Sequence, residues 1–285
     1  ILRKIMKILV TGGLGQLGKS LQKISKDYNY DFLFTDIAEL DITKEADVNE
    51  FIEKQKPDIV VNAAAYTAVD KAEDDEEMAL LLNAKAVENL AKACEKNSCR
   101  LVHISTDYVF NGLSSHPYTI EDETKPMSVY GQTKLVGEQL AIKYCTKVNV
   151  IRTSWLYSEF GKNFVKTMLT LGKEKQEIGV VYDQVGTPCY ATDLAKAIMS
   201  LVERPSKQRI MHFSNEGVCS WYDFARKIME LSGLDCKVRP ILSKEYPTKA
   251  QRPEFSVLDK SLIKKELNIT IPHWEDSLKQ MLNNL

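Results

Sequence analysis

The sequence predicts an α/β protein built on a parallel sheet, followed by a smaller C-terminal α/β region. Short apolar runs alternate with helical patterns through the first half of the chain, which is typical of βαβ units. A glycine-rich turn also separates the first predicted strand from the first predicted helix. The strands expected in this half are Lys7–Thr11, Phe32–Thr35, Asp58–Asn62, Arg100–Ser105 and Val148–Ser154.

Helix start and stop signals place helices between these strands. The second of them ends before Pro57, which cannot continue a helix, although Ala46 leaves the capping box at Thr43 incomplete. The helices expected here are Gly15–Lys26, Thr43–Lys56, Glu76–Asn97 and Ser128–Cys145.

The pattern becomes less regular after residue 155. We expect residues 1–155 to form the sheet domain and residues 156–285 a smaller, interleaved region, with the elements near 178–215 rejoining the sheet. The later elements expected are helices near Asn163–Gly172, Asp193–Glu203, Trp221–Leu231 and Trp274–Leu285, strands at Ile178–Tyr182 and Ile210–Ser214, and a Pro-containing stretch at Val238–Pro253.

Charge and composition exclude several classes of function. The formal net charge is -1, so nothing predicts a general electrostatic attraction to nucleic acid or anionic lipid. The longest apolar runs are far too short to span a membrane. The six cysteines are scattered without a C-x-x-C pair, which predicts neither disulfides nor a zinc site and favours the cytoplasm. We expect Met6 to be the natural start, with Ile1–Ile5 upstream of it.

The turn after the first strand, Thr11–Gly18, reads T-G-G-L-G-Q-L-G. Glycines between a strand and a helix let backbone N–H groups approach a pyrophosphate at the positive end of the helix. Glycine is also a simple turn former, so the prediction depends on the strand, the helix and a following acid. Together they predict a Rossmann-type doubly wound sheet and an NAD-binding domain at residues 1–155. The turn residues expected at the cofactor are Gly12, Gly15, Gln16, Leu17 and Gly18.

The following acid is Asp36, at the end of the second strand. A carboxylate there accepts hydrogen bonds from the adenosine ribose and repels a 2′-phosphate, so it favours NAD(H), with NADP(H) as the alternative. A turn or cap role, which is common for Asp, is the alternative, and the glycine-rich turn before it favours the ribose role. Further along, two short segments are expected to border the cofactor, although sheet packing also explains the alanines. They are Asp41, Ile42, Ala63, Ala64 and Ala65.

Tyr130 and Lys134 form a Y-x-x-x-K pair, which places both side chains on one face of the predicted helix. A free tyrosine has a pKa near 10 and is a poor acid–base group at neutral pH. A lysine cation and an oxidised nicotinamide beside it would lower that pKa. The phenol could then exchange a proton with a substrate oxygen while hydride moves at the adjacent carbon. Lys134 could also bind the nicotinamide ribose.

Position distinguishes this pair from an incidental Tyr and Lys on an exposed helix face. The pair follows the fourth strand, which ends in Ser105-Thr106-Asp107. A hydroxyl at the carboxyl end of such a strand can bind the same substrate oxygen as the tyrosine. We assign that role to Thr106, with Ser105 as a helper or a strand-end cap. The predicted catalytic trio is therefore Thr106, Tyr130 and Lys134.

These residues resemble the extended, sugar-nucleotide branch of the short-chain dehydrogenase/reductase superfamily. Several longer blocks are similar to the RmlD family of dTDP-4-dehydrorhamnose reductases, and the similarity spans nearly the whole chain. The blocks are Val61–Glu73, Ser105–Gly112, Tyr130–Glu138, Arg152–Tyr157, Gly161–Met168, Asp183–Pro188 and Arg252–Leu258.

The resemblance implies reduction of the 4-keto group of dTDP-4-dehydro-6-deoxy-L-mannose, with Tyr130 as the proton donor. It also implies that Thr106 and Asp107 contact the sugar and that Trp155 walls the pocket, although a lone Trp is more often a core residue. Asn163 and Arg252 are candidate ligands of the dTDP group, because the planar guanidinium suits a diphosphate. A helix cap for Asn163 and a surface ion pair for Arg252 are the alternatives.

The sequence departs from the pattern of the family at one place. Some members dimerise through a magnesium ion held by acids, and two of those acids align with Ser20 and Thr192. We therefore expect no metal, and a monomer or a weak homodimer. Two other functions stay open. One is a reductase or epimerase of another nucleotide sugar, and the other is a non-catalytic NAD(P)-binding subunit like the regulatory subunit of methionine adenosyltransferase.

Overall fold

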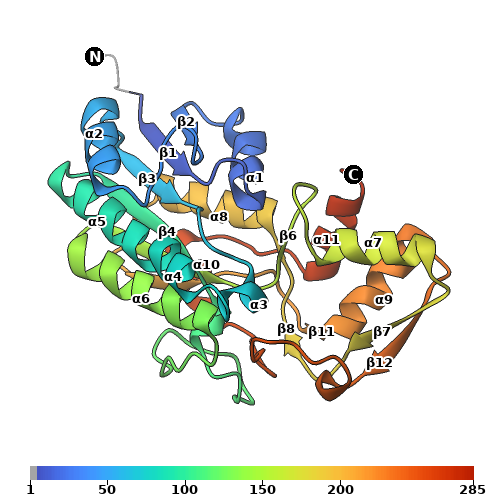
Figure 1. The fold of residues 1–285 in the computed structure, drawn as a ribbon. Helices are drawn as coiled ribbons and strands as arrows, with labels where there is room; N and C mark the ends of the chain where they lie inside the picture. The colour runs from blue at the N-terminus through green and yellow to red at the C-terminus, as the bar shows by residue number, and fades with distance from the viewer. Residues whose placement is uncertain (1–4) are drawn as a thin grey trace.

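The computed structural model describes residues 5–285, so the segment expected to precede Met6 lies outside the described residues except for Ile5. Its centre is a six-stranded sheet in which every paired strand is parallel (Figure 1). This confirms the predicted Rossmann-type α/β class. The strands are β1 Lys7–Thr11, β2 Asp31–Thr35, β3 Ile59–Asn62, β4 Arg100–Thr106, β5 Val148–Thr153 and β10 Ile210–His212.

The strand order is β10-β5-β4-β3-β1-β2, so the winding direction reverses between β1 and β3. Connections leave the two strands in opposite directions at this point and open a crevice at their carboxyl ends, which is where open α/β sheets bind ligands. The glycine-rich turn follows β1, and the small residues Ala63, Ala64 and Ala65 follow β3. The topology therefore brings these two predicted segments together.

Alternating strand residues bury opposite faces of the sheet under two layers of helices. Leu9, Val60 and Leu101 pack with one helical layer, whereas Ile8 and Val61 pack with the other, and all five side chains are buried. The first layer is α2 Glu45–Gln55, α5 Ala86–Lys96 and α6 Val129–Tyr144, and the second is α1 Gln16–Ser25, α8 Ala191–Glu203 and α10 Ser261–Leu267.

The helix predicted at Glu76–Asn97 is interrupted. After α3 Val69–Ala72, the segment forms α4 Glu76–Leu80, a π-helical turn at Leu81–Lys85, and then α5. The buried Asn83 in this turn bonds both backbone groups of Tyr66 and the Thr133 hydroxyl of α6. These tertiary bonds accompany the extra residue in the turn, which apolar periodicity does not reveal.

A further hydrophobic cluster packs among elements of the C-terminal half. Strand β7 Glu177–Val181 pairs there with β12 Lys237–Ile241, a strand that we did not predict from the sequence. Pro240 weakens the strand pattern there, because proline donates no ladder hydrogen bond. The remaining elements are α7 Phe164–Glu174, α9 Trp221–Ser232, α11 Trp274–Leu282 and the short strands β6 Leu156–Tyr157, β8 Val185–Gly186, β9 Cys189–Tyr190 and β11 Cys219–Ser220. Figure 1 shows α7, α9, β7 and β12 grouped to one side of the central sheet.

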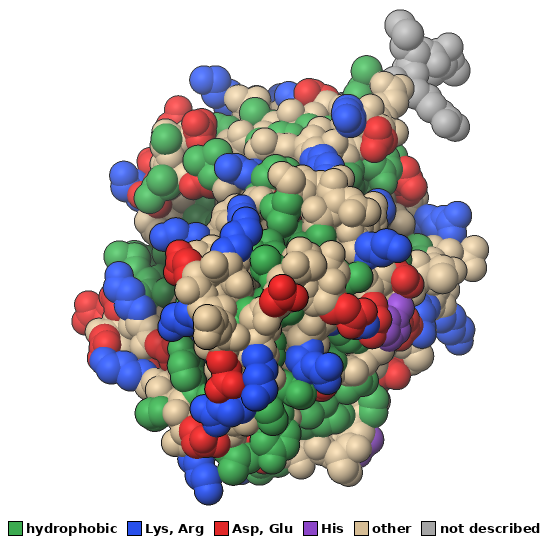
Figure 2. Space-filling model, turned by 90° about the vertical axis from the view of Figure 1, so that its right-hand side faces the viewer, with side chains coloured by type: hydrophobic (Ala, Val, Ile, Leu, Met, Phe, Trp, Pro, Cys, Tyr) green, Lys and Arg blue, Asp and Glu red, His purple; other side chains and the backbone are tan. Residues whose placement is uncertain are grey.

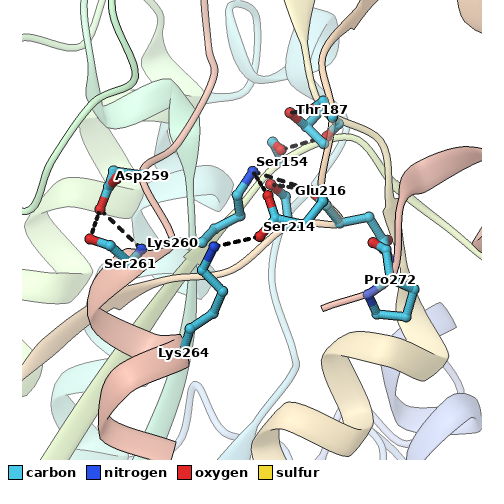
Figure 3. A network of polar contacts seen from close by, with 11 residues as sticks. Ser154, Thr187, Ser214, Glu216, Asp259, Lys260, Ser261, Lys264 and Pro272 are labelled. Carbon is cyan, nitrogen blue, oxygen red and sulfur yellow. Dashed lines mark hydrogen bonds and ion pairs between the residues drawn. The ribbon is translucent and has the colours of Figure 1, made fainter. Parts of the chain in front are cut away.

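A polar network joins the end of β10 to α10 and to the chain before α11 (Figure 3). The buried Lys260 donates to the Asn215 carbonyl at 3.2 Å, and Glu216 pairs with both Lys260 and Lys264. The Glu216 backbone N–H donates to the Pro272 carbonyl. These bonds connect the sheet to the C-terminal cluster.

Charged side chains of both signs are mixed over the face seen in Figure 2, in keeping with the near-zero net charge. Within residues 5–285, no helix has both the length and the apolar character needed to cross a membrane.

Candidate active site

A cavity of about 830 Å³ lies at the carboxyl ends of the central strands, where the strand order reverses. Its size is that of sites for small organic ligands and cofactors. Gly18 and Arg252 are the predicted site residues that do not line it. The predicted residues that do are Gly12, Gly15, Gln16, Leu17, Asp36, Asp41, Ile42, Ala63, Ala64, Ala65, Thr106, Asp107, Tyr130, Lys134, Trp155 and Asn163.

The glycine-rich turn is packed too tightly for side chains. Gly12 has φ +70°, and a Cβ atom on it would lie 2.6 Å from the Ala64 backbone nitrogen. A Cβ atom on Gly18 would overlap the Gly12 carbonyl, so Gly18 lets α1 approach the turn from behind the cavity wall. Gly15 caps α1 without a side-chain hydrogen bond. The N-terminus of α1 is therefore open to the cavity, as a diphosphate site requires.

Asp36 stands at the far end of this turn. One carboxylate oxygen accepts the Leu14 N–H at 3.0 Å, and the other accepts the Ile37 N–H at 2.9 Å. The Leu14 and Ile37 side chains are 67% and 73% exposed at the cavity mouth. Nearby, hydrogen bonds from Thr43 lower the pKa of Asp41, which therefore stays ionised. The wall around Asp36 thus combines acids with apolar side chains.

Helix α6 holds the Tyr130–Lys134 pair against the end of β4. The Ser128 hydroxyl caps this helix by accepting the Gly131 N–H at 3.2 Å. Lys134 is 2% exposed, and its ammonium donates to the Ile104 carbonyl at 2.6 Å. The Thr106 side chain hydrogen-bonds Tyr130 and donates to the Asp107 carboxylate at 2.9 Å. The structure therefore brings the predicted trio together in one wall of the cavity.

Burial dominates the electrostatics of this wall. Burial raises the pKa of Tyr130, and the hydrogen bond between Tyr130 and Thr106 only partly opposes this effect. Burial also lowers the pKa of Lys134 to about 8, against the nearby Glu138 carboxylate, which raises it. In the protein chain by itself the pKa of Tyr130 is therefore raised, because losing water disfavours the phenolate and the ammonium alike. At neutral pH the Tyr130 phenol keeps its proton.

Asp107 and Tyr108 line the cavity beside this trio. Asp107 is 2% exposed, and burial raises its pKa to about 6, despite hydrogen bonds to Ser256 and Thr106. The Tyr108 ring meets the Tyr130 ring edge-on, with centroids 5.4 Å apart. A polar acid and an aromatic surface thus lie next to the phenol.

Trp155 and Asn163 come from the chain between β5 and α7. Trp155 adopts φ +42°, which is strained for a bulky residue, and its ring stacks on Trp221 at 3.5 Å. Asn163 caps α7 by accepting the Lys166 N–H, and its amide donates to Gln16 at 2.9 Å. The cap role is therefore present, and Asn163 also ties the glycine-rich turn to the opposite wall.

Arg252 lies outside the main cavity. Its guanidinium pairs with Asp70 at 2.7 Å, and it lines a second cavity of about 370 Å³ with Tyr246 and Gln251. Arg252 also hydrogen-bonds Tyr108, whose pKa burial raises to about 12 against the effect of this cation. Because Tyr108 lines the main cavity, the Arg252 side chain lies just behind its wall.

Comparison with known proteins identifies the family. Residues 6–285 match the family model described as RmlD substrate binding domain. The chain belongs to the RmlD family. It is 42% identical to the spore coat polysaccharide biosynthesis protein SpsK of Bacillus subtilis, over 97% of this chain and 96% of that protein. It is 39% identical to the dTDP-4-dehydrorhamnose reductase of Escherichia coli, over 98% of each chain.

Solved structures of RmlD relatives share the fold over their full length. A dTDP-4-dehydrorhamnose reductase from Clostridium acetobutylicum superimposes with a TM-score of 0.95 at 43% identity, covering 98% of this chain and 99% of that one. A second, from Bacillus anthracis and in complex with NADP, gives 0.94 at 37% identity, covering 99% and 100%. The resemblance inferred from the motif blocks is thereby confirmed.

Several cavity residues escaped the sequence reasoning. Tyr108 and Thr153 line the cavity beside predicted residues, and Lys162 lines it next to Asn163. Each lies within a motif block shared with the RmlD family, and that proximity was the available signal. Ser20 and Thr192 carry hydroxyl groups and no carboxylates. Among residues 5–285 no group of three or more His, Cys, Asp or Glu side chains could hold a metal.

Proposed function

We propose that the chain reduces the 4-keto group of dTDP-4-dehydro-6-deoxy-L-mannose to give dTDP-L-rhamnose. The observation that carries this proposal is the meeting of Thr106, Tyr130 and Lys134 in the same cavity as the glycine-rich turn and Asp36. Relatives named dTDP-4-dehydrorhamnose reductase, which align over nearly their whole length, support the choice of substrate.

The cavity fits a nicotinamide dinucleotide, which supplies the hydride when it is bound. The open N-terminus of α1 and the turn at Gly12 and Gly15 would hold its diphosphate. Asp36 would accept hydrogen bonds from the adenosine ribose, and Ala63–Ala65 would lie under the dinucleotide. Lys134 would bind the ribose next to the nicotinamide.

We further propose that NADH is preferred over NADPH. A 2′-phosphate would meet the Asp36 carboxylate and the exposed Ile37 side chain. The cavity wall near Asp36 is formed by Leu14, Leu40, Asp41 and Ile42, none of which can neutralise a phosphate. The NADP complex of the Bacillus anthracis relative makes this preference a question for direct measurement.

Tyr130 would act as the proton donor. As hydride reaches C4 of the sugar, negative charge develops on the C4 oxygen, and the Tyr130 phenol gives it a proton. The raised pKa of Tyr130 suits this direction, because the group must be protonated before the reaction. Thr106 would hydrogen-bond the same oxygen, and the Lys134 ammonium would stabilise the phenolate that is left.

The remaining predicted residues would hold the substrate. Asp107 and Trp155 line the cavity beside Tyr130 and would contact the sugar. We place the dTDP group toward Arg252, whose guanidinium adjoins Tyr108 behind the cavity wall. The amide of Asn163 is already bonded to Gln16 and Ser158, so we propose a positioning role for it.

The deciding experiment supplies the purified protein with NADH and the dTDP-linked 4-keto sugar. We expect NADH oxidation to match the formation of dTDP-L-rhamnose, followed by absorbance and by mass spectrometry. A parallel panel of other 4-keto nucleotide sugars tests the substrate. Turnover of a panel member without turnover of the dTDP sugar would contradict the proposal.

A further inference from the structure

Ser105 carries a hydroxyl group that the protein itself leaves unpaired. Its side chain is 3% exposed, and among residues 5–285 no hydrogen-bond partner reaches its Oγ atom. The residue nonetheless lines the main cavity. Because an unsatisfied buried polar group costs free energy, such a group needs an explanation.

Two of the three neighbouring hydroxyl groups have partners within the protein. Thr106 donates to Asp107 at 2.9 Å, and Ser154, on the adjacent strand end, donates to the Thr187 carbonyl at 2.7 Å (Figure 3). Within the described part of the chain the Thr153 hydroxyl is also buried and unpaired, but Thr153 pairs with Thr106 across β4 and β5, so its side chain faces the side of the sheet opposite to that of Ser105. The fold thus satisfies two of the four hydroxyls at the ends of β4 and β5, and of the other two only Ser105 shares its side with Arg152.

Strand register shows which way the Ser105 side chain points. Ser105 pairs with Arg152 across β4 and β5, and paired residues of a parallel ladder face the same side of the sheet. The Arg152 guanidinium binds Glu138 on α6, one helical turn beyond Lys134. The Ser105 hydroxyl therefore faces the α6 side of the sheet, where Lys134 binds the carbonyl of the preceding residue.

We propose that the Ser105 hydroxyl is a cofactor ligand that binds the nicotinamide–ribose half of the dinucleotide beside Lys134. The inference rests on the proposed function, in which Lys134 holds that ribose. It separates two adjacent hydroxyls: Ser105 serves the cofactor, and Thr106, bonded to Tyr130, serves the sugar. The bound cofactor would supply the hydrogen-bond partner that the Ser105 hydroxyl lacks within the described residues of the protein.

The test uses Ser105→Ala and three ligands, each of which contains a different part of the cofactor or the substrate. NADH contains the nicotinamide half, ADP contains only the adenosine diphosphate half, and dTDP represents the substrate. We expect the dissociation constant for NADH to rise about three- to tenfold, as for one lost hydrogen bond. The constants for ADP and dTDP, measured by calorimetry, should stay the same.

A matched control is Ser154→Ala, which makes the same chemical change to a buried, cavity-lining serine whose hydroxyl is partnered. Removing that hydroxyl leaves the Thr187 carbonyl without it, so the melting temperature of the free protein should fall. Ser105→Ala removes an unpaired group, so its melting temperature should stay the same or rise. Opposite responses of two serines at the same site would identify the Ser105 hydroxyl as a ligand group.

Three outcomes would overturn the inference: unchanged NADH affinity in Ser105→Ala, a fall in its melting temperature equal to that of Ser154→Ala, or weakened dTDP binding. The first outcome would leave the hydroxyl without a role in binding. The second would assign it to folding, and the third would assign it to the substrate. Failure of the unmodified protein to bind NADH would instead contradict the proposed function, so the two failures are distinguishable.

Discussion

Glu138 binds Arg152 through a bidentate ion pair that is almost fully buried. The Arg152 Nε–Glu138 Oε1 and Arg152 NH2–Glu138 Oε2 distances are 3.0 Å and 2.8 Å, and the two side chains are 3% and 2% exposed. The pair joins α6 to β5, and the same carboxylate raises the pKa of Lys134. The Glu138 carboxylate, which binds Arg152, therefore also favours the charged ammonium of Lys134.

Glu138→Gln should destabilise the protein strongly, by about 3–5 kcal/mol, because it leaves a buried guanidinium uncompensated. The free energy of unfolding in urea measures this. Lys85→Ala, which breaks an exposed pair with Glu88, is the control and should cost less than about 1 kcal/mol. If both substitutions lowered the free energy of unfolding by the same small amount, the buried pair would contribute no more to stability than an exposed one.

Tyr130→Phe should lower kcat by at least about a hundredfold, because the lost phenol acts as a general acid. NADH affinity, measured by fluorescence titration, should change little, since the hydroxyl acts mainly in the transition state. Tyr144→Phe, at the other end of α6, is the matched control and should leave kcat unaffected. Near-normal turnover by Tyr130→Phe would exclude the phenol as the proton donor.

Asp36→Ala should reduce the discrimination against NADPH, because it removes the carboxylate that would repel a 2′-phosphate. The quantity to compare is the ratio of kcat/KM for NADH to that for NADPH, which should fall about tenfold if one charged contact is lost. Asp31→Ala, at the exposed start of the same strand, should leave the ratio unchanged. Equal use of both cofactors by the unmodified protein would show that Asp36 does not select.

Asp107→Asn should stabilise the protein relative to the unmodified chain, increasingly as the pH rises from about 4 to about 6. The folded-state pKa of Asp107 lies above its ordinary value, so its protonated form favours folding at low pH and that contribution is lost as the pH rises through about 6. A shift of two pKa units corresponds to about 3 kcal/mol. Urea unfolding at pH 4 and pH 7 measures the change.

The exposed Asp235 provides the control, because Asp235→Asn should show no such pH-dependent gain. A constant stability difference between Asp107→Asn and the unmodified protein at both pH values would mean that water reaches Asp107 and keeps its pKa ordinary.

Sequence by itself determined the parts of this protein that depend on local chemistry. Short apolar runs alternating with helical patterns located the six strands of the sheet. In the turn that follows the first strand, Gly12 and Gly18 stand where the backbone packing leaves no room for a side chain. The spacing of Tyr130 and Lys134 placed both on one helical face. These features depend on residues close in the chain, so their physical causes are visible in the sequence.

Only the tertiary structure decided what depends on distant neighbours. Burial, set by packing from several elements, gave the Tyr130 pKa a direction opposite to the one expected from Lys134. The pairing of Arg252 with Asp70 joins residues far apart in the chain. The Ser105 hydroxyl is buried and has no hydrogen-bond partner among the residues that the structure describes. Burial and the absence of a partner depend on distant residues that pack around it, so the sequence does not show them.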